Sequence, residues 1–342
     1  MRHASPERAV GLAILVVAFL APLIVTTYWL SALLTQVLLL GIIAASLTFL
    51  SAFGGMVSLA QVAVYGIAGF AVGNATTTDT KGLDLNWNPW IGVGLGLVFG
   101  TVVALVFGAL AARSVGIYFL MITLTFGVIA NLFFGQVTQL SGFGGISGIP
   151  MPASLGPADS QPGRLYYIAL VLSLLVYFGF RYVVRTPFGL ALQGIRDDPV
   201  RMSSLGYHVG LHRMLAFGFA GFVSSVGGIL FVWWNGHIDP ASIDIGQMID
   251  VLAIAVIGGL YRLEGAWLGA FVYVVLNNYL QTIGFIGPRF DTVIGIIFLV
   301  IVVVSPSGLM GLWERALGML GRREPGGGGT SPLASTTASA DL

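Results

Sequence analysis

Long apolar segments separated by short polar ones make up most of this chain. The segments at residues 10–25 and 91–112, for example, contain no charged residue. A helix needs about 20 mostly apolar residues to cross the hydrocarbon core of a membrane. Backbone groups in lipid must be hydrogen-bonded internally, so only helices or a closed barrel can span it, and a barrel would show short alternating segments. The pattern therefore predicts an all-α protein, a polytopic membrane helical bundle.

We predict about ten transmembrane helices, with a range of eight to ten. The predicted crossings are 10–29, 31–53, 55–75, 90–112, 116–135, 165–184, 213–235, 248–260, 266–284 and 291–305. They make residues 10–305 a transmembrane domain. The first apolar run follows Arg2 and Arg8, as in a signal peptide. It is long enough to span and no small-residue cleavage site follows it, so we predict that it is retained as a helix.

The basic residues predict the orientation of the bundle. With the N-terminal segment 1–9 in the cytoplasm, twelve of the 15 basic residues fall on the inner side, and Lys81, Arg164 and Arg289 fall on the outer side. An excess of arginine and lysine marks the cytoplasmic side of a membrane protein. Both termini are therefore predicted to be cytoplasmic. The tail at 306–342 is rich in glycine, serine, threonine and alanine near its end, and we predict disorder from about residue 324.

Composition excludes several functions. Only 8% of the residues are charged, and the mean hydropathy is +0.93, whereas soluble domains carry about 25% charged residues. The absence of cysteine removes disulfides, thiolate nucleophiles and cysteine metal sites. Lys81, the one lysine, follows Thr80, so the chain has no Gly-Lys phosphate loop of its own. We predict no catalytic residue, metal or cofactor, and no binding of nucleic acid.

Glycine is abundant, with 48 residues, and scattered glycines such as Gly92, Gly94 and Gly96 fit close packing between helices. A cluster at Gly54-Gly55 is harder to explain in this way, because two adjacent glycines favour a break in a helix. Broken backbone is tolerated at membrane depth only where protein or water covers it. Ser58 and Gln61 follow the break, and they either line a translocation pathway or form hydrogen bonds between helices.

Two other glycine clusters follow along the chain. The first, at 141–150, comes after the fifth predicted crossing, which contains Thr123 and Thr125. Threonines in membrane helices usually bond to their own backbone, and we favour this interpretation for each alone. The other cluster contains Gly258-Gly259 and repeats the first break in spacing, since a leucine follows each glycine pair after three intervening residues.

Asp250 is the main acidic residue inside a predicted crossing. An intramembrane acid is a functional candidate, although a small shift in the helix boundary would place it at the membrane interface, which is the interpretation we favour. No second buried acid or nearby histidine makes a proton relay with it. His208 and His212, four residues apart, lack the pattern of a zinc protease.

The loop at 185–212 is predicted to contain two short helices. Thr186 and Asp198 can cap them, each followed by a proline at the first helical position. Phe188, Leu192 and Ile195 form an apolar stripe, and Gly206 fits the position that ends the second helix. Such a loop can lie on the membrane, pack on its own protein or dock into a partner.

The sequence of this loop resembles a known motif. Its residues Thr186-Pro187-Phe188-Gly189, Gly194-Ile195-Arg196-Asp197-Asp198 and Leu205-Gly206 are similar to the cytoplasmic motif of permease subunits of branched-chain amino acid ATP-binding-cassette (ABC) importers, of the LivM type. Four further segments resemble the family in the same order: Gly54 to Leu59, Gly116 to Leu124, Gly142 to Pro150 and Gly258 to Ala270. Arg201-Met202, where small residues are usual, and Tyr261, where glycine is usual, depart from it.

The resemblance implies a transport subunit in a bacterial plasma (inner) membrane that is powered by two separate ABC ATPase subunits. It implies a second, LivH-like permease, and an extracytoplasmic solute-binding protein that would deliver an amino acid to segments such as 136–164 and 236–247. It assigns an ATPase-coupling loop, with Arg196, Asp197, Asp198, Pro199, Leu205 and Gly206. Together with the polar and glycine pattern, it marks as possible pathway residues Gly54, Gly55, Ser58, Gln61, Thr123, Thr125, Gly258 and Gly259.

Three alternatives remain open at this point. Relatives of the same family carry urea or short amides. An ion-coupled secondary transporter or channel would need a buried acid, for which Asp250 is the candidate. A membrane scaffold without transport activity would not need repeated glycine breaks.

Overall fold

The fold is described from a computed structural model. It describes residues 18–19, 22, 29–77, 83, 85–152, 155–156, 162–280, 292–297, 299 and 308–311. This part of the chain is mostly helical. Its elements are η1 Trp29–Thr35, α2 Gln36–Gly54, α3 Ala60–Thr76, α4 Pro89–Ala111, α5 Gly116–Gln136, β1 Ile146–Ser147, α6 Pro162–Arg185, α7 Pro187–Asp197, α8 Pro199–Ser204, α9 Val209–Asn235, β2 His237–Ile238, η3 Pro240–Ile243, α10 Ile245–Gly258 and α11 Leu263–Leu280. The predicted helical bundle is confirmed, and the two short strands are the exception.

Five helices within the described residues are long and apolar enough to cross a membrane. They are Leu33–Gly54, Pro89–Ala111, Gly116–Gln136, Gly163–Arg185 and Val209–Asn235. Helices α10 and α11 meet at a bend of 116° and together count as at most a sixth span. The eighth and ninth predicted crossings are therefore joined by a sharp bend. The total of about ten stays a prediction, since most of 10–29 and 291–305, and the tail after 311, lie outside the described residues.

The third predicted crossing begins later than the sequence suggested. Residues 55–59 are not helical, and α3 begins at Ala60. Its 17 residues span about 26 Å, which is short for a hydrocarbon core of about 30 Å. The preceding segment 55–59 runs at up to about 3.3 Å per residue and can supply the missing length. Helix α3 is not among the five candidate spans of the described residues, so a third crossing made of this segment and α3 stays a prediction.

Helices α2, α3 and α9 form the centre of the bundle, and α4, α5 and α6 lie toward its outside. Most residues of α2 and α9 are buried, whereas only a minority of those in α4, α5 and α6 are. Helix α4 turns a ridge of small residues toward the centre, at Gly92, Gly96, Gly100, Ala104 and Gly108. A Cβ atom on Gly100 would lie 2.1 Å from Ser225 Oγ. Close packing therefore explains Gly92 and Gly96, but it does not explain Gly94, which faces open space.

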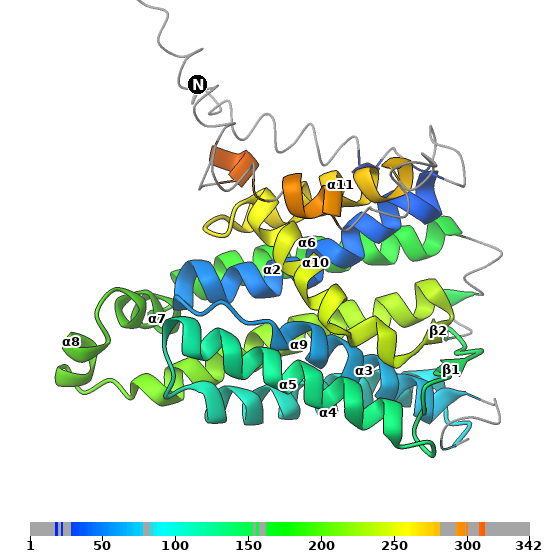
Figure 1. Ribbon diagram of the computed structural model, residues 1–342, viewed down its shortest axis with the longest axis horizontal. Helices are drawn as coiled ribbons and strands as arrows, with labels where there is room; N and C mark the ends of the chain where they lie inside the picture. The colour runs from blue at the N-terminus through cyan, green and yellow to red at the C-terminus, as the bar shows by residue number, and fades with distance from the viewer. Residues whose placement is uncertain are drawn as a thin grey trace, which may run out of the picture.

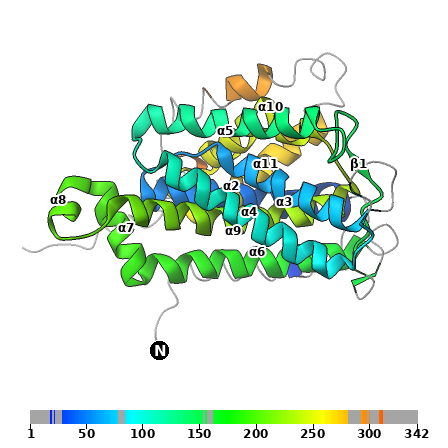
Figure 2. The same cartoon turned by 90° about the horizontal axis from the view of Figure 1, so that it is seen from below.

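The two ends of the bundle differ in character. Helices α7 and α8 project from one end, and β1 and β2 lie at the other (Figure 1 and Figure 2). Arg213 at the start of α9 donates to the Ala112 carbonyl at the end of α4, over 3.3 Å. Thr77, after α3, donates to the Ser147 carbonyl over 3.0 Å. These contacts join segments that the sequence assigned to the same side of the membrane; that the α7–α8 end is cytoplasmic stays a prediction.

Candidate functional site

The first glycine pair ends α2 through a defined turn. Gly55 has a φ of 65°, in the left-handed region that favours glycine. The Gly55 N–H donates to the Ser51 carbonyl over 3.2 Å, and the Met56 N–H donates to the Leu50 carbonyl over 3.0 Å. The bond from Gly55 to Ser51 is that of the left-handed helix ending, in which the glycine N–H binds a carbonyl four residues back. The predicted break at Gly54-Gly55 is thus confirmed, and local sequence explains it.

A threonine from α5 holds the irregular segment that follows. The Leu59 N–H donates to Thr123 Oγ1 over 3.3 Å, and the Thr123 hydroxyl donates to the Leu120 carbonyl over 3.0 Å. Thr123 therefore bonds its own helix, as favoured from the sequence, and also ties α5 to the start of α3. Thr125 bonds only the Met121 carbonyl, over 2.9 Å, and is exposed.

Ser58 and Gln61 are fully buried beside this break. Within the described residues, Ser58 Oγ and both side-chain amide atoms of Gln61 have no hydrogen-bond partner. The Gln61 backbone carbonyl, in contrast, accepts from Ser224 Oγ of α9 over 2.6 Å. A buried polar atom without a partner costs about 1–3 kcal/mol. The alternative of bonding between helices by these two side chains finds no support in this conformation.

The second glycine pair lies where α10 and α11 meet. Gly259 has a φ of 122°, and the two helices contact each other through backbone atoms. A Cβ atom on Gly258 would lie 1.8 Å from the Gly265 carbonyl oxygen, and one on Gly269 would lie 2.0 Å from the Ile254 carbonyl oxygen. These glycines allow a close approach that larger residues would prevent.

The start of α11 is linked to α6 by polar contacts. The Tyr177 hydroxyl donates to Glu264 Oε1 over 2.7 Å, and Arg181 donates to the Tyr177 hydroxyl over 2.7 Å. Arg181 and Glu264 are 3.9 Å apart. The second break is therefore anchored to the last turns of α6, directly before the projecting α7.

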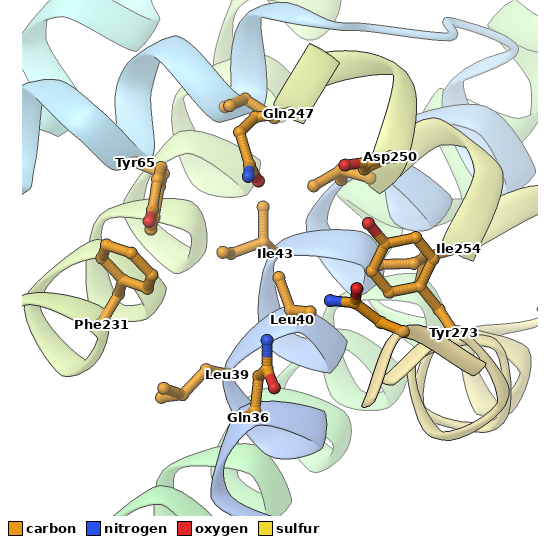
Figure 3. A pocket seen from close by; sticks show the side chains of 13 residues that line it. Gln36, Leu39, Leu40, Ile43, Tyr65, Phe231, Gln247, Asp250, Ile254 and Tyr273 are labelled. Carbon is orange, nitrogen blue, oxygen red and sulfur yellow. The ribbon is translucent and has the colours of Figure 1, made fainter. Parts of the chain in front are cut away.

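A small cavity lies among the central helices, with a volume of about 80 Å³. Its polar lining comes from four helices: Gln36 on α2, Tyr65 on α3, Gln247 and Asp250 on α10, and Tyr273 and Asn277 on α11. The apolar lining residues are Leu39, Leu40, Ile43, Val62, Phe231, Val251 and Ile254. Figure 3 shows the amides of Gln36 and Gln247 reaching toward the cavity from opposite sides.

The cavity and the first break share helix α3. Val62 and Tyr65 line the cavity, and Gln61 precedes Val62 by one residue and Tyr65 by four. Residues four apart lie on the same side of a helix. The unpaired amide of Gln61 is therefore adjacent to the cavity wall along α3, on the side of the break.

The projecting loop has the local structure that its sequence predicted. Thr186 Oγ1 accepts from the Gly189 N–H over 3.4 Å. Asp198 Oδ1 accepts from the Val200 and Arg201 N–H groups over 3.1 and 2.9 Å. Gly206, at φ 89°, follows the end of α8. These bonds confirm both capping predictions. Caps can be predicted from sequence because the groups that form each one lie within three residues of one another.

Helices α7 and α8 differ in burial. Leu192 and Ile195 of the predicted apolar stripe are fully buried, and α7 contacts α2, α6 and α9. No residue of α8 is buried, and the apolar side chains of Val200 and Leu205 are exposed. The α7 half of the loop packs on its own protein, whereas α8 presents an uncovered surface.

Arg196 points toward the bundle and contacts the first break. Its guanidinium donates to the Ala52 carbonyl near the end of α2 and pairs with Asp197 at 2.8 Å. A Cβ atom on Gly55 would lie 2.7 Å from Arg196 Cγ. The guanidinium of Arg196 thus connects α7 with the end of α2, and its place in an ATPase-coupling loop stays a prediction.

At the opposite end, β1 pairs antiparallel with β2, with Ile146 opposite Ile238. This pairing joins the segments 136–164 and 236–247, which the sequence placed together on the outer side. Asn131 of α5 donates to the Pro240 carbonyl over 2.6 Å. The described part of these loops is therefore ordered by contacts with each other and with the helices.

The structure brings some of the sequence candidates together and separates others. Gly54, Gly55 and Arg196 meet at the end of α2, and Ser58 and Gln61 lie at the start of α3, where Thr123 binds. Thr125 lies apart on an exposed face. No group of three histidine, aspartate or glutamate residues that could hold a metal ion occurs within the described ranges.

Most of the cavity residues were missed from the sequence. Asp250 was singled out from the sequence, and the structure places it half-buried on the cavity wall; its position at the membrane interface stays a prediction. Gln36, Gln247 and Asn277 were not considered. Isolated amides in apolar segments are a signal that could have identified them. A polar side chain on the lipid-facing side of a membrane helix is costly, so such a residue usually faces the interior of the bundle.

Comparison with known proteins identifies what the chain resembles. Residues 29–302 match the family described as "Branched-chain amino acid transport system / permease component". The "High-affinity branched-chain amino acid transport system permease protein LivM" of Escherichia coli (strain K12) is 26% identical over 250 residues, which cover 66% of this chain and 59% of that protein. No solved structure matches the chain.

Two further relatives match a larger share of their own length. The "Probable branched-chain amino acid transport permease protein LivM" of Methanocaldococcus jannaschii is 25% identical, with 76% of this chain and 81% of that protein covered. The "Autoinducer 2 import system permease protein LsrD" of Klebsiella pneumoniae is 27% identical, with 81% and 83% covered. The similar proteins thus include permeases with names for two different solutes.

Proposed function

Because this chain belongs to the branched-chain amino acid transport system permease family, we propose that it is the transmembrane permease subunit of an ABC importer for branched-chain or related amino acids. The chain would form part of the translocation pathway and would hydrolyse no ATP itself. Two separate ABC ATPase subunits would power the transport. A second, LivH-like permease would complete the pathway in the plasma (inner) membrane of a bacterium.

The observation that carries the proposal is the polar cavity inside an otherwise apolar bundle. Six polar side chains from α2, α3, α10 and α11 line it. Polar groups at membrane depth are costly and typically mark a pathway for solutes or ions. Two of the lining helices, α2 and α10, also end at glycine pairs, and broken helices are a usual feature of binding sites in transporters.

We assign the first break to the pathway on the cytoplasmic side of the cavity. Ser58 and Gln61 are buried and unpaired in this conformation. Movement of the segment 54–59 would expose them to water or solute and satisfy them. Thr123 would hold the segment in its present position. Gly258 and Gly259 would set the position of α10, which carries part of the cavity wall. Thr125 is exposed. It would line a pathway only if a partner subunit packed against this face of α5.

The α7–α8 loop supports a coupling role. Its α8 half has exposed apolar side chains, Val200 and Leu205, and a capping acid, Asp198. We propose that Asp198 to Gly206 dock on an ATPase subunit, where Pro199 starts the helix and Gly206 ends it. Arg196 and Asp197 would then transmit motion inward, because the Arg196 guanidinium binds the end of α2.

The opposite end would receive the solute. An extracytoplasmic solute-binding protein would dock near the paired segments 136–164 and 236–247. The β1–β2 pairing supports this assignment by giving these segments a common surface. Among the described residues, α10 begins beside this end, directly after β2 and η3, and carries Gln247 and Asp250 into the cavity.

Transport assays on the purified subunit and on the complete importer test the proposal. The subunit alone, reconstituted in vesicles with an imposed ion gradient, should carry no leucine. The complex with both ATPases, the second permease and the binding protein should carry leucine only when ATP is supplied. Uptake by the subunit alone would contradict the proposal and support an ion-coupled transporter that uses Asp250.

A further inference from the structure

A buried arginine lies where α9 begins, at the base of the projecting loop. Arg213 is only 9% exposed, and its guanidinium donates to the Ala112 carbonyl, just after the end of α4, over 3.3 Å. Within the described residues, Arg213 Nε has no hydrogen-bond acceptor, and no carboxylate pairs with this guanidinium. The connections 112–115 and 205–208, which adjoin it, are described in full. The described part of the chain thus buries a cation here without an anion.

Such a buried cation favours the binding of an anion. Taking a charge out of water carries a large free-energy penalty, which a paired anion with further hydrogen bonds offsets. A guanidinium has five N–H donors, and the bond to Ala112 uses one of them. The C-terminal end of α4 contributes only about half an elementary negative charge. The remaining charge can therefore attract an anionic group from outside the chain.

The surface of α4 beside this arginine is apolar and ends in a second basic residue. Val98, Val102, Val106 and Leu110 follow one another at intervals of four residues, so they share one side of the helix, and each is 50–61% exposed. Arg113 follows Leu110 by three residues and is exposed. Arginines near the ends of membrane helices place their charge at the interface. We call the four apolar residues the α4 stripe.

We propose that Arg213 and Arg113 bind the phosphate group of an anionic phospholipid of the cytoplasmic leaflet, whose acyl chain lies along the α4 stripe. This inference rests on the membrane orientation in the proposed function. Basic pockets between transmembrane helices on the cytoplasmic side bind the head groups of anionic lipids. A guanidinium suits a phosphate because it can donate two parallel hydrogen bonds. A head group with an additional cation would bring that cation close to two arginines and would bind less tightly.

The dimensions of the α4 stripe fit one acyl chain. The twelve-residue interval from Val98 to Leu110 spans about 18 Å of helix. One leaflet provides about 15 Å of hydrocarbon, which is half of a core of about 30 Å. A phospholipid can therefore contact the arginines and the whole stripe at once. An acidic side chain of a partner protein would neutralise Arg213 but would leave the stripe uncovered.

Lipid binding to the purified subunit tests this assignment. Native mass spectrometry in detergent measures the affinities for phosphatidylglycerol, which is anionic, and for phosphatidylcholine, which is zwitterionic. We expect phosphatidylglycerol to bind about tenfold more tightly, because charge-assisted hydrogen bonds to two arginines are strong. Arg213→Gln should remove most of this preference, because it deletes the buried charge and keeps an N–H donor for the Ala112 carbonyl.

Three further variants separate lipid binding from folding. Arg213→Lys keeps the charge and should keep the preference for phosphatidylglycerol. Arg113→Gln changes an exposed residue, so it should fold normally and still lower the preference about threefold, since it loses one charged donor. Arg185→Gln is the matched control, because Arg185 is an exposed arginine at the same end of the bundle. It should leave the preference unchanged.

The source of the anion and the outcomes that overturn the proposal are tested in the same way. Glycerol phosphate, which has no acyl chain, should compete only weakly with phosphatidylglycerol, and equal competition would overturn the lipid assignment. Equal affinities for the two lipids, or an unchanged preference in both Arg213→Gln and Arg113→Gln, would also overturn it. So would loss of the bound lipid when the ATPase subunits assemble. These measurements need no transport, so a failed uptake assay would overturn the proposed function and leave the lipid site standing.

Discussion

The two glycine pairs look alike in the sequence, but one packs against side chains and the other packs against backbone. Gly54-Gly55 ends α2 in a side-chain environment, where Arg196 lies over Gly55 and Thr123 binds the backbone of the next segment. Gly258-Gly259 ends α10 against backbone, where Gly258 faces the Gly265 carbonyl. Side chains can change rotamer on a fast time scale, whereas packed backbone cannot shift without moving a helix.

This difference separates two roles. The first break has buried unpaired polar groups, a bond to α5 and a contact with the projecting α7, which are features of a segment that can take two positions. The second break is tightly packed and anchored to α6 through Glu264, which are features of a fixed support. We expect substitutions at the second break to affect folding most, and substitutions at the first to affect coupling.

The largest expected effect comes from adding one methyl group at each break. Gly258→Ala would place a Cβ atom 1.8 Å from the Gly265 carbonyl oxygen, and we expect a loss of several kcal/mol in the free energy of unfolding, since the helices must separate. Gly55→Ala, at φ 65°, should cost about 1–2 kcal/mol, because the nearest side chain, Arg196, can move. Thermal unfolding of the purified protein in detergent measures both.

Gly94→Ala is the control for these two variants, because no atom of another described segment lies within 4 Å of the added Cβ position on Gly94. It should leave the unfolding temperature unchanged or raise it slightly. If Gly258→Ala and Gly94→Ala had the same unfolding temperature, the second break would not be a tightly packed, rigid support.

The Arg196 contact tests whether the first break takes part in coupling ATP hydrolysis to transport. Arg196→Ala removes a charged donor from the Ala52 carbonyl, and a hydrogen bond to a charged group is worth about 1.5–3 kcal/mol. We expect the complete importer to hydrolyse ATP at near-normal rates but to carry at least fivefold less leucine per ATP. The ratio of uptake to hydrolysis in vesicles is the measurement.

Arg185→Ala serves as the comparison for Arg196→Ala, because Arg185 is an exposed residue at the same end of the bundle. Its uptake per ATP should match that of the unmodified importer. Normal coupling in Arg196→Ala would mean that motion reaches the pathway by another route.

Gln61 provides a test in which stability and activity change in opposite directions. Its amide is buried and has no partner among the described residues, so Gln61→Leu should raise the free energy of unfolding by about 1–2 kcal/mol and lower leucine uptake. Thermal unfolding and uptake are measured on the same variant. A loss of stability together with normal uptake would remove Gln61 from the proposed pathway.

The smallest effect is expected at the threonine pair. Thr123→Val removes the acceptor for the Leu59 N–H and should cost about 1 kcal/mol. Thr125→Val makes the same substitution on an exposed face of the same helix. It should change the free energy of unfolding by less than about 0.5 kcal/mol. Equal unfolding temperatures for the two variants would show that Thr123 does not hold the first break.

Several features were predictable because their causes are local. Thr186 and Asp198 cap helices through backbone groups two or three residues away, and Gly55 ends α2 through bonds to the preceding turn. The conformation of such groups depends on the immediate sequence. That the cavity residues lie together was not predictable in this way, because Gln36 and Asn277 are 241 positions apart in the chain and only the packing of α2 against α11 brings them together.

The features that the sequence did not reveal have the same origin. Gly94 was grouped with Gly92 and Gly96 by composition, but it lies on the outer face of α4. The contact of the Arg196 guanidinium with the end of α2 could not be read from the sequence, and its place in an ATPase-coupling loop stays a prediction. Thr123 and Thr125 are two residues apart and chemically identical, yet one is buried at the break and the other is exposed. Which face of a helix packs against another helix depends on where that other helix lies in the bundle.

The sequence by itself determined that this protein is an apolar helical bundle, that its helices break at two glycine pairs and that a capped two-helix loop projects from it. Hydropathy, backbone freedom and capping act over a few residues, so they can be deduced from the order of residues alone. The tertiary structure decided which polar groups share a cavity, which break is rigid and which way Arg196 points. These properties arise from contacts between segments far apart in the chain, which only the packed bundle creates.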